Sequence, residues 1–210
     1  MTYRRFPKLT LLVDCRSHLI LAATPGRGPS PDHGGLIPTL LAGRARCLID
    51  TLLADAGFDA EWAHHFARDE LDIRSIIPPE IGRQTTKPPS GRYRRLMRAY
   101  FRRPPERRRY GQRWQVETVF SMIKRRLGDT LGARNRFRQD RAMLLKAVTH
   151  NVLILWWLKV FYRARMSPLL LNKVECPLYC HILKNFPHES GGNAEASPVV
   201  VEASVHRPFG

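Results

Sequence analysis

The stretch RRRYGQRWQVETVFSMIKRRLG (residues 107–128) holds four polar residues whose types and spacing could act on a phosphodiester: Tyr110, Arg113, Glu117 and Lys124. On an α-helix with Arg113 at 0°, Lys124 falls at about 20°, Glu117 at about 40° and Tyr110 at about 60°. A carboxylate on a stripe with two cations could hold a metal ion where nucleic acid arrives. It could equally form an i,i+4 pair with Arg113, which supports a helix by roughly 0.2–0.5 kcal/mol.

Such a helix needs a buried face that fixes the direction of its polar stripe. The apolar residues of the same stretch fall between about 240° and 340° on the helix; they are Val116, Val119, Phe120, Ile123 and Leu127. We therefore predict a helix over residues 107–128 that buries this face. The polar stripe then lies at the edge of the face and can line a cleft.

One carboxylate is too few for metal-assisted phosphoryl chemistry, since Mg²⁺ prefers several hard oxygen ligands. A second acid is expected at a strand end, and Asp55 follows the apolar run TLLA (51–54) directly. Two neighbouring acids are not expected to take part in chemistry. Asp50 is predicted to be structural, and Asp59 is predicted to cap the next helix. His64 and His65 are expected on the surface of that helix.

The charge of the chain points to a polyanionic partner, most simply nucleic acid. The 210 residues include 35 Lys or Arg against 18 Asp or Glu, which gives a formal net charge of +17. Residues 83–141 alone hold 19 basic and 4 acidic residues, whereas residues 50–80 hold 8 acidic and 2 basic ones. A basic block with so few acids favours contact with nucleic acid over a solvated charge run.

The order of apolar runs and turn signals predicts α/β layering. Residues 8–14 and 18–24 form the two runs expected for a β-hairpin, and residues 80–106 read as a basic loop or linker with a helical piece near its end. The other expected elements are a short helix near 34–44, a strand within 46–59, a helix over 60–72, a strand over 73–79 and a helix over 141–164.

Composition also indicates a soluble protein of the cytoplasm. The four cysteines, at 15, 47, 176 and 180, do not form a disulfide framework at this length, and we expect free thiols. The apolar run VLILWWL (152–158) is too short to span a bilayer, and no signal peptide is expected at the start.

The residues above match a known pattern. Tyr110, Arg113, Glu117 and Lys124 follow the spacing Y-(2)-R-(3)-E-(6)-K, which resembles the signature of insertion-sequence transposases of the DDE superfamily, in the type-four group. The stretches LLADAGFD, LTLLVDCRSHLILAATPGRGPSPDH and KAVTHNVLIL, the last with Asn151, are also similar to that family. The resemblance covers roughly residues 7–163.

The resemblance implies an RNase H-like fold, in which helices flank a mixed sheet. It also implies an enzyme that cleaves transposon ends and joins the freed 3′-OH to target DNA with Mg²⁺ or Mn²⁺. Asp55 and Glu117 would be catalytic and metal-binding. Contacts to double-stranded DNA are expected from the rest of the signature and from neighbouring arginines: Tyr110, Arg113, Lys124, Arg107, Arg108, Arg109, Arg125 and Arg126. A homodimer on paired ends, a nucleoid location and no membrane partner are also expected.

Members of the family have three catalytic acids, and the first of these ends the central strand that precedes the hairpin. The chain departs from the family at this first acid. Asp14 ends an apolar run, but its surroundings resemble the hairpin strand that follows the catalytic one. The resemblance therefore implies a copy truncated at its N-terminus, without the first central strand. The hairpin and the Asp55 strand would then pair directly or leave unpaired edges.

These considerations predict an incomplete catalytic domain over residues 1–164 and a C-terminal extension over 165–210, largely disordered from about residue 185. Activity should be weak or absent, because two carboxylates leave too few metal ligands. Two alternatives stay open: a basic module that binds nucleic acid without catalysis, and a decayed fragment. A strand ending in Asp, encoded in the DNA upstream of Met1, would identify a truncated transposase.

Overall fold

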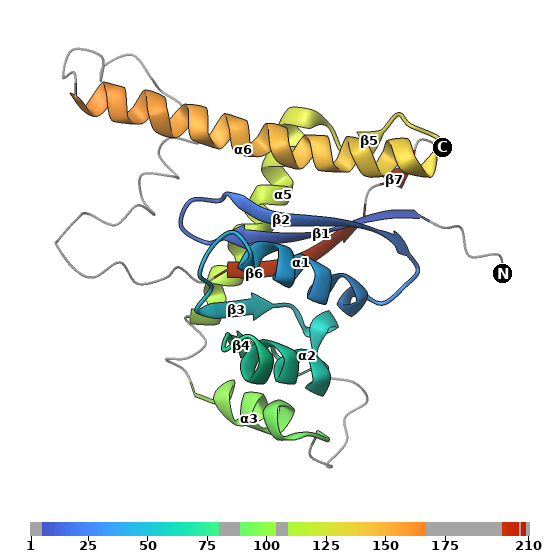
Figure 1. Ribbon diagram of the computed structural model, residues 1–210, viewed down its shortest axis with the longest axis vertical. Coiled ribbons are helices and arrows are strands. Elements are labelled where there is room, and N and C mark those ends of the chain that lie inside the picture. Colours follow the sequence, from blue (N-terminus) through green and yellow to red (C-terminus); the bar gives the residue numbers. More distant parts are fainter. Residues whose placement is uncertain (1–5, 80–88, 104–108, 167–198, 206, 209–210) are drawn as a thin grey trace.

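A five-stranded mixed sheet with the strand order β2-β1-β6-β3-β4 lies at the centre of the fold, and helices pack on both of its faces (Figure 1). The structure is a computed structural model, and it describes residues 6–79, 89–103, 109–166, 199–205 and 207–208. The α/β class predicted from the sequence is confirmed.

The first two strands form the predicted hairpin. β1 (Phe6–Asp14) pairs antiparallel with β2 (Ile20–Gly28), with Thr10 opposite Thr24. β1 is buried on both faces, as expected for a nearly continuous apolar run inside a sheet. The Asp14 carboxylate accepts hydrogen bonds from the Ser17 backbone N–H at 2.8 Å and the Ser17 hydroxyl at 2.5 Å. Asp14 therefore stabilises the hairpin turn.

The acidic half of the domain forms β3 (Thr51–Ala54) and β4 (Arg74–Ile76), which are parallel. Parallel strands need a crossover, and here it consists of the 3₁₀ turn η2 (Ala56–Phe58), helix α2 (Glu61–His65) and a π-helical segment, η3 (Phe66–Glu70). The turn η1 (Asp32–Gly35) and helix α1 (Leu36–Arg44) connect the hairpin to β3.

One strand was not predicted from the sequence, and it lies at the centre of the sheet. β6 (Val199–Val205) lies between β1 and β3, antiparallel to the first and parallel to the second. The expectation that the hairpin and the Asp55 strand would pair directly or leave unpaired edges is therefore wrong. The segment VVVEASV is rich in β-branched residues, which favour strands. A second, two-stranded sheet pairs β5 (Thr130–Leu131) with β7 (Arg207–Pro208).

The two faces of the sheet carry separate cores. On one face, Leu9, Leu11, Val13 and Leu53 pack with residues of α5 (Trp114–Leu127) and α6 (Arg136–Met166). On the other, a second cluster joins the sheet to α1 and to the α2–η3 segment; its members include Leu12, Leu52, Ala54, Leu40 and Ala63. Helix α3 (Arg92–Tyr100) lies beyond β4, at the opposite end of the long axis from α6 (Figure 1).

Helix α6 is longer than predicted, and two contacts bind it to the hairpin. The Asn151 side chain accepts a hydrogen bond from the backbone N–H of Ile20 and donates one to its carbonyl, both at 2.8 Å. Over Arg136–Val160 this helix is long and apolar enough to cross a membrane by length and composition, a test that core helices of soluble proteins also pass. Its residues Met143, Ala147 and Ile154 are buried.

Candidate active site

The signature helix forms, but it begins later than predicted. A 3₁₀ turn, η4 (Gly111–Arg113), precedes α5, and the helix ends at Gly128, whose φ of 79° lies in the region that favours glycine. The predicted apolar face is buried at Val116, Val119, Phe120 and Ile123. The polar stripe on α5 is thus set by the burial of the opposite side, as the periodicity indicated.

Glu117 lies on the exposed side of α5. Its carboxylate pairs with the Arg113 guanidinium one turn earlier at 2.7 Å, with 54% of the Glu117 side chain and 22% of the Arg113 side chain exposed. Lys124, two turns later, is also exposed. An exposed ion pair of this kind contributes at most about 1 kcal/mol to stability. Another cation could therefore replace Arg113 as the partner of the Glu117 carboxylate at little energetic cost.

Tyr110 departs from the predicted stripe. Its ring lies 5.0 Å from the Phe101 ring at 86° and packs against the core cluster on the α5 face. The 3₁₀ turn between Tyr110 and α5 changes the rotation per residue, so an ideal helix misplaces this side chain. The tyrosine therefore takes part in packing at the start of the helix.

Asp55 lies where the sequence placed it, directly after β3. Its backbone is extended, its side chain is exposed, and its carbonyl accepts a hydrogen bond from the Phe58 N–H at 2.9 Å, which closes the η2 turn. Along β3 the residues alternate between the two cores, with Leu53 on the α5 face and Ala54 on the other. Continued alternation directs Asp55 toward the α5 face.

Two carboxylates from different elements are of the right chemical type for a hard divalent cation, but they are few. Among the residues whose side chains the structure describes, no group of three His, Cys, Asp or Glu could hold a metal ion. Mg²⁺ binds through several oxygen ligands. The described side chains by themselves therefore do not fit a metal centre, and we derive no reaction step through one.

Buried polar contacts hold the start of α5 against the hairpin turn, and no pattern in the sequence predicts them. The Gln115 side-chain oxygen is hydrogen-bonded to His18, and the His18 carbonyl accepts a hydrogen bond from His150 of α6 at 3.0 Å. Burial lowers the pKa of His150, which keeps that ring neutral. Burial likewise raises the pKa of the nearby Cys15 thiol to about 12, so this cysteine is no nucleophile.

A second group resembles a hydrolytic triad, but it lies in the interior. His64 Nδ1 is 2.8 Å from the Ser75 hydroxyl, and His64 Nε2 is 3.8 Å from Asp59 Oδ1, beyond hydrogen-bond reach. All three side chains are buried, and Arg68 donates to the same hydroxyl at 2.9 Å. A substrate has no access to this serine, so the group is structural.

This region corrects two predictions from the sequence. Asp59 does not cap the next helix: the N-cap of α2 is Ala60, and Asp59 is paired with Arg94 of α3 at 2.7 Å. His64 is buried rather than on the surface, whereas His65 is exposed as expected.

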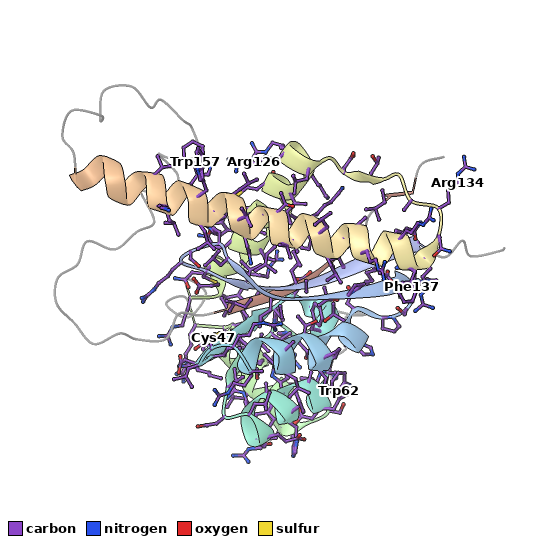
Figure 2. All side chains as sticks on the ribbon, turned by 45° about the horizontal axis from the view of Figure 1, so that its top comes forward. Cys47, Trp62, Arg126, Arg134, Phe137 and Trp157 are labelled. Carbon is purple, nitrogen blue, oxygen red and sulfur yellow. The ribbon has the colours of Figure 1, made fainter. Side chains whose placement is uncertain are left out.

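The basic block divides between two ends of the molecule. Arg109, Lys124, Arg125 and Arg126 are exposed on or just before α5, whereas Arg107 and Arg108 lie outside the described residues. Arg126 and Arg134 lie on the α6 side of the sheet, opposite Cys47 and Trp62 (Figure 2). The arginines of α3 lie at the far end of the long axis (Figure 1).

Comparison with known proteins decides the family. The family described as "Transposase DDE domain" matches residues 2–152, well over half of the chain. The chain belongs to this family of DDE transposases. No curated protein and no solved structure matches it. The matched range includes the hairpin, Asp55, Glu117 and the Asn151 contact of this transposase domain.

Family membership gives the transposase a role in DNA transposition. Members of the family normally use a divalent metal ion and are typically soluble and cytoplasmic. A role in DNA transposition agrees with the basic charge of the chain.

Proposed function

We propose that this domain catalyses metal-dependent cleavage and strand transfer at transposon ends, as a member of the type-four insertion-sequence group with an RNase H-like fold. The observation that carries the proposal is the placement of Glu117. It lies on the exposed side of a helix whose opposite face is buried in the core, beside cations, within a range that matches the transposase family.

In this proposal the residues of the chain divide the work. Asp55 and Glu117 would supply two carboxylate oxygens to Mg²⁺ or Mn²⁺, and the ion would supply Lewis-acid activation of the phosphodiester. Arg113 and Lys124 orient the phosphate backbone of double-stranded DNA through charge-assisted hydrogen bonds, and Arg109, Arg125 and Arg126 extend this contact. The protein acts as a homodimer on paired ends, in the cytoplasm on the nucleoid.

Activity is expected to be weak, because two carboxylates among the described residues leave too few ligands for a metal ion. The test uses the full chain with labelled DNA that carries the ends of the element, in Mg²⁺ or Mn²⁺. Glu117→Gln and Asp55→Asn should remove cleavage, while Glu70→Gln, an exposed acid on η3, should not. Cleavage that survives Glu117→Gln would remove this residue from the mechanism.

DNA binding gives an independent readout, and it also tests the second candidate function. The exposed basic residues of α5 favour binding without catalysis as the alternative. Phosphate contacts make affinity fall steeply with salt, and replacement of Lys124 and Arg125 by Gln should reduce that salt dependence, whereas Glu117→Gln should leave it unchanged. Steep salt dependence without cleavage in either metal would favour the binding module.

A further inference from the structure

Helix α6 has a second apolar side, opposite the one that packs on the sheet. Met143, Ala147 and Ile154 on the packed side are buried, whereas six large apolar side chains on the other side are between 37% and 65% exposed. At about 100° per residue, these six fall within an arc of about 120° of the helix. We call them the α6 stripe: Leu144, Leu145, Val148, Val152, Leu155 and Trp156.

The spacing within the α6 stripe is typical of a seam between two helices. Four of its members, from Leu145 to Leu155, follow one another at intervals of three, four and three residues. This is the heptad pattern of apolar positions at which one helix packs against another. The same spacing continues to an exposed cation at each end, Arg141 and Lys159. The stripe therefore fits an apolar helix with the same period.

The apolar area of the stripe is large for the surface of a monomer. Phe137, which is 71% exposed and lies under the Arg141 guanidinium at 5.4 Å, extends it toward the start of α6. At about 200 Å² for a fully exposed large side chain, the stripe and Phe137 present roughly 800 Å². Monomeric proteins rarely expose contiguous apolar patches above a few hundred Å². Two copies together would bury roughly 1,600 Å², the size of a standard specific interface.

Contacts on the packed side keep α6 attached to the domain. His150 is buried, and its Nε2 lies 3.0 Å from the His18 carbonyl oxygen. One turn of the hairpin is also bound through the Asn151 amide, which pairs with the backbone of Ile20. These polar contacts lie in the middle of the apolar length of the helix and favour a helix that remains on the sheet over one that crosses a membrane.

We propose that the α6 stripe is the contact surface between two copies of this chain, with α6 of one copy packed on α6 of the other. This inference rests on the function proposed above, which uses a homodimer, and it deepens that function by assigning the surface. In either relative orientation of the two helices, the cations at the ends of one stripe approach those of the other. Salt screens this repulsion, so the association should strengthen as salt rises, whereas DNA binding weakens.

Sedimentation velocity of the full chain, without DNA or metal, tests the proposal. The wild type should form a dimer whose dissociation constant falls as salt rises. Val148→Glu with Val152→Glu should weaken the association by at least about a hundredfold, because both carboxylates would be enclosed by apolar side chains without a partner. Leu41→Glu with Leu48→Glu, at two exposed leucines in and after α1, is the matched control and should associate as the wild type does.

Chemical denaturation shows whether each variant is folded. The urea midpoint of the wild type should rise with protein concentration, because association stabilises only the folded chain, and the midpoint of the double variant should not. If the double variant loses the circular dichroism signal of a folded chain, Leu145→Gln takes its place. This single change at the most exposed position of the stripe should weaken the association by at least about tenfold.

The outcomes separate this inference from the function on which it rests. A monomeric wild type, or a folded stripe variant that still associates as the wild type does, overturns the interface whether or not the chain cleaves DNA. Association that weakens as salt rises overturns it as well. A wild type that associates through the stripe but does not cleave DNA supports the interface and contradicts the proposed catalysis. A monomer that binds phosphatidylcholine vesicles through these residues would assign the stripe to a membrane surface instead.

Discussion

Two arginine–carboxylate pairs in this transposase domain have the same N–O distance and opposite surroundings. Arg94 and Asp59 meet at 2.7 Å with the Asp59 side chain fully buried, and Arg113 and Glu117 meet at 2.7 Å with 54% of the Glu117 side chain exposed. A carboxylate in the interior that loses its partner is left desolvated and charged, whereas an exposed one is solvated by water. Burial, and not distance, therefore separates a structural acid from one available for chemistry.

The neighbourhood of each pair supports this contrast. Next to Asp59, the Glu61 carboxylate accepts hydrogen bonds from the Tyr93 and Arg94 backbone N–H groups at 2.9 and 3.1 Å, in the first turn of α3. This acid and the buried pair together attach α3 to the domain. The pair on α5 joins two residues of neighbouring turns, so its loss leaves the contacts of α5 with the sheet in place.

The largest effect is expected when the buried pair is broken. Arg94→Met should lower the free energy of unfolding by about 3–5 kcal/mol, because the Asp59 carboxylate stays buried without its cation. Urea denaturation of the two single variants would measure this against Arg113→Met, for which we expect less than about 1 kcal/mol. Similar losses from both variants would contradict the distinction drawn from burial.

A neutral polar contact should fall between the two charged pairs. Asn151→Ala removes both hydrogen bonds to the Ile20 backbone, and at roughly 1 kcal/mol each this should cost about 2 kcal/mol of stability. Thr149→Ala, on another side of α6, serves as the control in the same denaturation experiment. A loss no greater than that of the control would mean that α6 does not depend on this contact.

The contrast between buried and exposed groups also predicts a pH dependence. Burial holds the pKa of His150 below its unfolded value of 6.5, so the unfolded chain binds the extra proton as the pH falls. The stability that His150 contributes is present above pH 6.5 and is lost as the pH falls toward the folded-state pKa.

Thermal unfolding between pH 7.5 and 5 would measure this loss. His150→Asn should reduce the slope of the midpoint against pH in this range, and the exposed His65→Asn should leave it nearly as it is. An unchanged slope in His150→Asn would assign the pH dependence to other groups.

The smallest effect on stability is expected at the site itself. Glu117→Gln should change the free energy of unfolding by no more than about 0.5 kcal/mol, because it removes only an exposed i,i+4 pair. The same variant should abolish DNA cleavage, and the two readouts together distinguish a catalytic acid from a structural one. A large loss of stability would mean that Glu117 is a structural acid like Asp59, and it would count against the catalytic role proposed for Glu117.

Local patterns predicted the elements that carry Asp55 and Glu117. Two successive apolar runs, residues 8–14 and 18–24, predicted the hairpin. The buried face of α5 was predicted from apolar residues whose spacing places them on one side of an α-helix. The position of Tyr110 did not follow, because the 3₁₀ turn before α5 depends on how that segment meets Phe101 and the core.

The environments of charged residues were harder to predict. Asp59 resembles a helix cap and His64 a surface residue when only neighbours in the sequence are read. Both are buried because α3, some 30 residues further along, supplies Arg94, and β4 supplies Ser75. Pairing across such distances has no signature in a single sequence.

By itself, the sequence determined the family, the basic character and the acids at the end of β3 and on α5, because spacing and composition are local properties. Only the tertiary structure decided which carboxylates are buried and which strand lies at the centre of the sheet. A short β-branched segment can pair with many edges, and its place between β1 and β3 depends on backbone hydrogen bonds to residues between 147 and 197 positions away.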